Sequence, residues 1–114
     1  MDYPNKSEVK LTHYGRKSGK PFDVTIWYVV IDGALWVGSQ SDQRSWVRNL
    51  QATPRCAVDF GAGPVEHTAE WTSDPAAVER FTDAVRAKHP IMSRVILLMN
   101  RGAQPVAARL VPAA

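Results

Sequence analysis

The chain has 114 residues, a formal net charge of +3 and 45% hydrophobic residues. These values fit one globular domain spanning residues 1–114, and they exclude both a two-domain protein and a disordered chain. The longest clean apolar run, residues 26–31, is far shorter than the roughly 20 residues of a bilayer span. With no apolar signal segment at the N-terminus and a single cysteine, Cys56, we expect a cytosolic protein.

The first third of the chain predicts three strands. Residues 8–14 begin with polar–apolar alternation and end in β-favouring residues, so they predict a strand. Residues 15–21 hold two glycines and a proline, which predicts a turn. Residues 22–31 are rich in β-branched and aromatic side chains and predict a long buried strand. Asp32-Gly33 is a strong hairpin signal, and residues 34–39 form the returning strand.

A short helix is expected over residues 43–52, capped by Ser41 or Asp42 and ended by Pro54. Its predicted buried stripe consists of Trp46, Val47 and Leu50.

The second half predicts a further hairpin, a second helix and a last strand. The hairpin strands are residues 55–60 and 65–72. The second helix begins at Pro75, after Ser73 or Asp74 as cap, and ends at Lys88. Residues 91–99 predict another helical segment, and residues 105–111 a strand. The stripe that the second helix should bury contains Val78, Phe81, Ala84 and Val85.

Strands joined by tight turns pair in antiparallel fashion. About six such strands with two or three helices predict a mainly β, α+β fold. Its expected form is a small closed or partly closed barrel with the helices packed outside.

The turn at residues 15–20, Gly-Arg-Lys-Ser-Gly-Lys, is the most conspicuous polar feature, and we call it the basic turn. Five of the 14 basic residues lie in the first 20 positions. Glycines bring backbone N–H groups close to an anion, Arg16 can grip a phosphate with two hydrogen bonds, and Lys17 and Lys20 add charge. Two interpretations stand, an anion site and a solvated hairpin turn.

Residues 38–41 lead into the predicted helix, whose N-terminus favours anions. These residues would complete an anion cradle if the fold brings them beside the basic turn, and otherwise they serve only as a cap. Trp27, Tyr28 and Trp36 lie on the predicted hairpin, where core packing and stacking on a planar ligand are both open.

No catalytic residue or metal site is predicted. His13, His67 and His89 lack metal-ligand spacing, and Cys56 lies mid-strand without a local histidine. This does not exclude hydride transfer, because there the cofactor performs the chemistry and the protein binds and orients it.

Residues 12–21, residues 27–30 with Asp32-Gly33, and residues 46–54 resemble blocks of the deazaflavin (F-420)-dependent nitroreductase family of actinobacteria, in the same order and spacing. The resemblance implies a split β-barrel like that of FMN-binding proteins, with coenzyme F-420 as cofactor and FMN as the less favoured one. It assigns the phosphate of the cofactor to the basic turn and its ring to a groove. The implied phosphate residues are Arg16, Lys17, Ser18 and Gly19, and Lys20 of the same turn is also expected to bind the cofactor. The ring would be flanked by Pro21, Val24, Thr25 and Trp27, closed by Gly38, Ser39, Gln40 and Arg44, and backed by Trp46, Asn49 and Leu50.

The implied function is that of an oxidoreductase passing a hydride from reduced F-420 to a small, apolar, electron-poor acceptor such as a quinone, enone or nitro compound. This chain has no glycine in residues 40–44, and its only tyrosines are Tyr3, Tyr14 and Tyr28, so no proton-donating tyrosine is assigned. The alternative is a non-catalytic binding protein of the same fold for F-420, FMN or an apolar ligand such as a fatty acid or haem.

For partners, we expect the cofactor and the acceptor and no nucleic acid, because the basic residues cluster on one turn. We also expect a monomer or a homodimer, and peripheral membrane contact as a further partner interaction.

Overall fold

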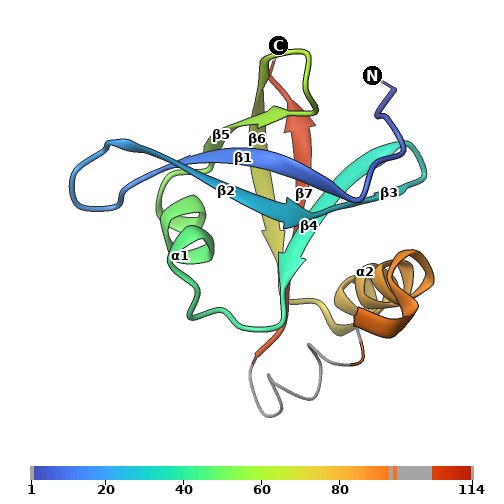
Figure 1. Ribbon diagram of the computed structural model, residues 1–114. Coiled ribbons are helices and arrows are strands. Elements are labelled where there is room, and N and C mark those ends of the chain that lie inside the picture. Colours follow the sequence, from blue (N-terminus) through green and yellow to red (C-terminus); the bar gives the residue numbers. More distant parts are fainter. Residues whose placement is uncertain (1, 93, 95–103, 114) are drawn as a thin grey trace.

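The computed structural model describes residues 2–92, 94 and 104–113, and it confirms the predicted α+β fold (Figure 1). Seven strands form one curled sheet, and the helices α1 and α2 lie outside it. The strands are β1 (Glu8–Tyr14), β2 (Pro21–Trp27), β3 (Val29–Ile31), β4 (Ala34–Ser39), β5 (Arg55–Asp59), β6 (Pro64–Thr72) and β7 (Val106–Pro112), and the helices are α1 (Ser45–Ala52) and α2 (Pro75–Lys88).

The sheet has the strand order β2-β1-β5-β6-β7-β4-β3, with every neighbouring pair antiparallel. Its two edges, β2 and β3, are joined in the chain by the single residue Tyr28. Because one stretch of chain supplies both edges, the sheet must curl until its edges approach each other. The result is the predicted split barrel, open between β2 and β4.

The long strand predicted over residues 22–31 is divided at Tyr28. Up to Trp27 it pairs with β1, and from Val29 onward it pairs with β4. Tyr28 is only 1% exposed, and its hydroxyl donates to the Pro4 carbonyl and accepts from the Lys6 N–H at 2.7 Å. The buried ring and its hydrogen bonds hold the chain where it leaves one edge for the other, which sequence periodicity does not reveal.

The core has two parts. One fills the barrel with the inward residues of β1, β4, β5 and β7, together with Leu50 of α1. The other lies beneath α2, where Val78, Phe81 and Val85 pack on Val29 and Ala107. The helical stripe predicted for α2 is therefore confirmed, with Ala84 half-buried at its border.

The helix ends confirm one prediction and correct another. Asp74 caps α2 as expected, its carboxylate accepting from the Ala77 N–H at 3.2 Å. The expected cap of α1 by Ser41 or Asp42 is wrong, because α1 begins at Ser45 after Arg44, without a side-chain cap. Ser41 Oγ instead accepts from the Gln43 N–H at 3.2 Å, so that hydroxyl stabilises the preceding loop.

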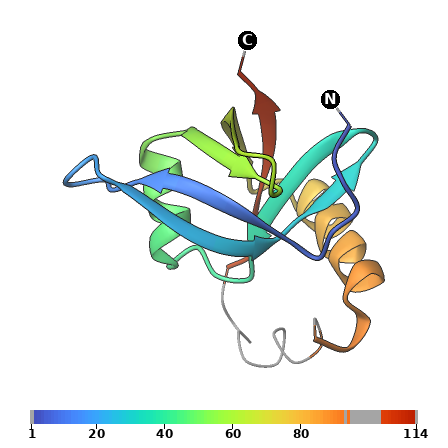
Figure 2. The same cartoon turned by 45° about the horizontal axis from the view of Figure 1, so that its top comes forward.

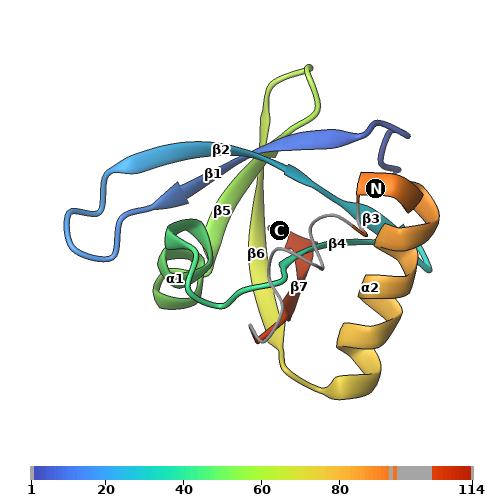
Figure 3. The same cartoon turned by 60° about the horizontal axis from the view of Figure 1, so that its bottom comes forward.

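The two helices flank the loop that follows β4, α1 on the side of β1 and β6 and α2 on the side of β3 (Figures 1 and 3). None of the helices described here combines the length and apolarity needed to cross a membrane. Of the helical segment expected over residues 91–99, residues 91, 92 and 94 are helical, and the others lie outside the described residues. The predicted Asp32-Gly33 hairpin is confirmed, with φ of 51° and 78°, the left-handed values that this turn requires.

Candidate functional site

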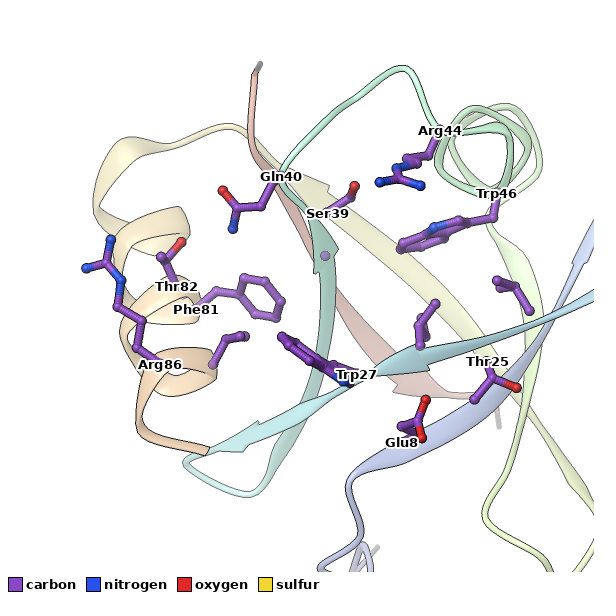
Figure 4. A pocket seen from close by; sticks show the side chains of 14 residues that line it. Glu8, Thr25, Trp27, Ser39, Gln40, Arg44, Trp46, Phe81, Thr82 and Arg86 are labelled. Carbon is purple, nitrogen blue, oxygen red and sulfur yellow. The ribbon is translucent and has the colours of Figure 1, made fainter. Parts of the chain in front are cut away.

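A pocket of about 320 Å³ lies where the barrel is split, between β2 and the end of β4, with α1 on one side and α2 on the other (Figure 4). This volume is at the lower end of the range of small-molecule sites, roughly 300 to 1,000 Å³. The lining residues are Glu8, Val24, Thr25, Ile26, Trp27, Gly38, Ser39, Gln40, Arg44, Trp46, Phe81, Thr82, Val85 and Arg86.

The walls of the pocket are apolar and aromatic. Trp27 and Phe81 face the cavity from β2 and α2, and Trp46 faces it from α1 (Figure 4). Gly38 makes room for this arrangement, because a Cβ at that position would lie 2.6 Å from Phe81 Cε2 and 2.5 Å from the Val106 oxygen. The lack of a side chain on β4 therefore lets the Phe81 ring reach the floor of the pocket. Such walls suit a flat, apolar ring.

Trp27 is held from behind by His89, the residue after α2. The two rings stack with centroids 3.9 Å apart and an interplanar angle of 7°. Burial, and secondarily the nearby Lys88 ammonium, lowers the pKa of His89 from its ordinary value of 6.5, against weaker opposing effects of Ser7 and Glu8. His89 is thus kept neutral, and its stacking fixes the orientation of the indole at the pocket wall.

The rim of the pocket is polar and carries both signs of charge. Arg44 stands on the α1 side of the opening, while Arg86 and Thr82 stand on the α2 side, and Gln40 extends from the end of β4 toward α2 (Figure 4). Thr82 Oγ1 donates to the Val78 carbonyl at 2.9 Å, so its hydroxyl offers only its lone pairs to a ligand. An apolar interior with a few converging polar groups is the usual composition of a cofactor or substrate site.

The basic turn lies outside this pocket, at the far end of the β1–β2 hairpin (Figure 2). The turn is closed by the Gly15 N–H donating to the Lys20 carbonyl at 2.9 Å and by the Gly19 N–H donating to the Gly15 carbonyl at 2.8 Å. Gly19 has φ of 70°, in the left-handed region that favours glycine. Because β2 leads directly from Pro21 to Val24 in the pocket, three residues at about 3.3 Å each separate turn and pocket by roughly 10 Å.

Asn49 of α1 connects the basic turn to the barrel. Its Oδ1 accepts from Arg16 Nη1 at 2.6 Å and from the Arg16 N–H at 3.2 Å. Its Nδ2 lies 3.1 Å from Nδ1 of His13 on β1. Asn49 is 6% exposed and His13 5% exposed. Desolvation lowers the pKa of His13, partly offset by the Asp23 carboxylate.

The structure thus divides the residues expected from the resemblance into two groups. The pocket brings together Val24, Thr25, Trp27, Gly38, Ser39, Gln40, Arg44 and Trp46. The lining does not include Arg16, Lys17, Ser18, Gly19, Lys20, Pro21 and Asn49, which lie at the hairpin end and on the side of α1 facing it. The resemblance also did not give six lining residues, namely Glu8, Ile26, Phe81, Thr82, Val85 and Arg86.

Four of these six come from α2, and the sequence carried a partial signal for them. Phe81 and Val85 lie four residues apart and were interpreted as core, which they are, although they also line the pocket. Thr82 and Arg86 have the same spacing one position later, so they share the neighbouring face of the helix. That this face turns toward β2 follows only from the tertiary packing.

Among the described residues, no group of three His, Cys, Asp or Glu side chains is placed to hold a metal ion. The described residues that line the pocket likewise include no His, Cys or Met, the usual axial ligands of a haem iron.

Residues 2–95 match the family model described as F420H(2)-dependent quinone reductase. No curated protein matches the chain in sequence. Among solved structures, the conserved hypothetical protein Rv2991 from Mycobacterium tuberculosis has a TM-score of 0.75 at 22% identity, over 96% of this chain and 75% of that one. An F420-H2 dependent reductase, FDR-A, has a TM-score of 0.71 at 21% identity, over 96% and 98%. HutZ, the haem storage protein from Vibrio cholerae, has a TM-score of 0.74 at 14% identity, over 96% and 84%. These three similarities establish a common fold.

Proposed function

This chain belongs to the F420H(2)-dependent quinone reductase family, and from that membership we propose that it passes a hydride from reduced F-420 to a small electron-poor acceptor. The observation that carries the proposal is the placement of an aromatic-walled pocket roughly 10 Å along β2 from a basic turn. One end of this arrangement suits a flat ring and the other a phosphate with an acidic tail.

The residues present fit this cofactor. Trp27 and Trp46 supply flat apolar surfaces, and Ser39, Gln40 and Arg44 supply polar groups beside them. At the other end, the exposed side chains of Arg16 and Lys17 are suited to bind the phosphate. F-420 supplies the hydride when it is bound.

The work of the protein is then to hold the ring, to leave one of its faces open to the acceptor and to exclude water. The wall opposite β2 serves to exclude water. Phe81 and Val85 of α2 are buried and apolar, so they shield that side of the pocket from solvent. We propose that an apolar acceptor, a quinone, enone or nitro compound, enters between this wall and the ring, near Thr82 and Arg86.

The alternative, a non-catalytic carrier of the same fold, draws on the similarity to HutZ. For haem it lacks support, because the described pocket lining offers no axial ligand to iron. A carrier of F-420, FMN or a fatty acid differs from the reductase in showing no turnover, so kinetics separates the two.

The test is a fluorescence titration with F-420 and FMN in parallel, followed by steady-state oxidation of reduced F-420 with a soluble quinone. We expect micromolar or tighter F-420 binding, weaker FMN binding and quinone-dependent oxidation. Arg16→Ala and Lys17→Ala should each weaken F-420 binding by about tenfold, the effect of one charge-assisted hydrogen bond. Arg80→Ala, which removes an exposed arginine of α2 outside this pocket, is the matched control and should bind as the wild type does.

Absence of binding to both cofactors would refute the proposal. Binding of F-420 without turnover of any acceptor would favour the carrier. Oligomeric state and peripheral membrane contact stay predictions, to be measured by light scattering after size-exclusion chromatography and by co-sedimentation with anionic vesicles.

A further inference from the structure

His13, Asn49 and Arg16 form a polar chain that runs from the interior of β1 to the basic turn. Two of its members, His13 and Asn49, are almost fully buried. These hydrogen bonds join three segments, because His13 lies on β1, Asn49 on α1 and Arg16 in the turn between β1 and β2. They leave only one consistent assignment of protons.

That assignment begins at Arg16, whose guanidinium and backbone N–H groups are donors only. Both point at the same atom of Asn49, at 2.6 and 3.2 Å, so that atom is the amide oxygen. The amide NH2 must then face His13 Nδ1, 3.1 Å away. Because NH2 is itself a donor, Nδ1 must carry a lone pair, and the proton of the neutral ring must be on Nε2.

A proton on Nδ1 of His13 would disrupt these hydrogen bonds. Two donors would then face each other at a buried site, which leaves both unsatisfied. Rotation of the Asn49 amide would satisfy the imidazolium but would turn the NH2 group toward Arg16. In the first case Asn49 loses the partner that orients its amide, and in the second case Arg16 loses its acceptor.

The surroundings of His13 keep it neutral. On its own hairpin, the Asp23 carboxylate of β2 favours the charged form, and the Arg16 guanidinium lies on the far side of Asn49. Phe22 adds an uncharged ring, stacked at a centroid distance of 5.9 Å. Desolvation is the larger effect and lowers the pKa of His13 from 6.5.

We propose that His13 is a positioning residue for the cofactor phosphate: its unprotonated Nδ1 orients Asn49, and Asn49 in turn holds Arg16 and the basic turn in the binding conformation. The inference rests on the proposed function, in which the turn holds the phosphate of F-420. His13 does not line the pocket and acts only through Asn49.

A pair of substitutions separates the acceptor from the ring. His13→Phe keeps a ring that can stack on Phe22 but removes Nδ1. His13→Asn places an amide oxygen near the position of Nδ1 and cannot be protonated in this range. We expect His13→Phe to weaken F-420 binding by about tenfold at pH 7.5, the usual effect of one lost buried hydrogen bond, and His13→Asn to stay within about twofold of the wild type.

The pH dependence of F-420 affinity is a second test, because a merely structural role of His13 would not change it. As the pH falls below 6.5 through the lowered pKa of His13, wild-type affinity should fall relative to that of His13→Asn. The ratio of the two Kd values cancels any titration of the cofactor itself.

Nuclear magnetic resonance tests the hydrogen bonds among His13, Asn49 and Arg16 in the absence of cofactor, so its result is independent of the proposed function. Long-range ¹H–¹⁵N spectra of the wild type should show His13 protonated at Nε2 and free at Nδ1 at pH 7.5. The Arg16 backbone amide shift should follow the titration of His13, and it should be displaced in His13→Phe but not in His13→Asn.

If the wild type binds F-420 and His13→Phe binds it with the same affinity, the inference is overturned. Equal losses of affinity in His13→Phe and His13→Asn would also overturn it. If the wild type binds no F-420, the proposed function fails and the spectra decide alone. An Arg16 amide that ignores the titration of His13 then rejects the positioning role. The wild-type titration needs no variant, so a misfolded substitution leaves the test intact.

Discussion

His89 shows at the scale of one residue how packing sets a protonation state. Its ring is stacked on Trp27, and its Nε2 is buried with no hydrogen-bond partner in the described part of the chain. Protonation of both ring nitrogens would place a positive charge in a desolvated site beside Lys88, with no acceptor at Nε2 among the described residues, which is consistent with the lowered pKa of His89. Trp27 therefore contacts a neutral ring on one side and the pocket on the other.

The lowered pKa of His89 predicts acid sensitivity. Above pH 6.5 the group is neutral in both folded and unfolded chains and contributes no pH dependence. Below pH 6.5 the unfolded chain binds the proton first, so stability falls as pH falls through the lowered pKa. We expect His89→Phe, which keeps the stack, to show a shallower decline of Tm between pH 7.5 and 5 than the wild type. His13 titrates in the same direction, so some decline should remain, and an unchanged slope would contradict the assignment.

Cys56 is the single cysteine, and it is fully buried in β5. Burial, with a smaller effect of Glu66, raises the pKa of the thiol to about 12. Since the thiolate is the reactive form, we expect the native protein to resist an aromatic disulfide reagent at pH 8 and to react only as it unfolds. A Ser73→Cys, Cys56→Ala double variant, with an exposed thiol, is the control and should react at once. Fast labelling of native Cys56 would show that β5 opens locally.

At the scale of elements, the contact between β4 and α2 determines the shape of the pocket. Gly38→Ala would place a methyl group against Phe81 Cε2 and the Val106 oxygen, at 2.6 and 2.5 Å. We expect a loss of about 1–3 kcal/mol in the free energy of unfolding, the usual effect of overpacking, measured by urea denaturation. Combining it with Phe81→Leu should recover part of that loss, because the clashing ring atoms are gone. Strictly additive losses would mean that the methyl group clashes with the backbone alone.

The elements themselves were largely predictable, since β1 has the predicted bounds and α2 begins at the predicted Pro75 after Asp74. Local signals suffice there because alternation, turn residues and caps act within a few positions. The division of the strand at Tyr28 was not predictable, because it depends on contacts with Pro4 and Lys6, more than 20 residues away. The family resemblance led us to expect lining residues on β2 and β4, whereas the α2 wall, which depends on how the helix packs against the sheet, was not expected.

At the scale of the whole molecule, Tyr28 is the residue through which the barrel, the N-terminal segment and α2 are joined. Its ring meets Phe60 edge to face at 5.0 Å, and the Lys88 ammonium lies 3.6 Å from its centroid. Lys88 Nζ also donates to the Tyr28 carbonyl at 2.9 Å. A second anchor of the same N-terminal segment is the hydrogen bond between Tyr3 Oη and His67 Nε2, at 2.9 Å. The segment thus contacts both Tyr28, where the chain passes from one sheet edge to the other, and His67 of β6.

Removing the hydroxyl oxygen in Tyr28→Phe tests whether the N-terminal segment holds the two sheet edges together. The change leaves the buried ring in place but removes the hydroxyl that binds Pro4 and Lys6. Because two backbone groups lose their partner, we expect the free energy of unfolding to fall by about 1–3 kcal/mol, and amide exchange in residues 2–7 to accelerate. Tyr14→Phe, at the end of β1, is the control and should change stability by less than about 0.5 kcal/mol. If exchange accelerates in residues 2–7 while β2 and β3 keep their protection, the N-terminal segment is only attached to the barrel. If protection at β2 and β3 falls as well, the segment closes the split beside the pocket, and cofactor affinity should fall with it.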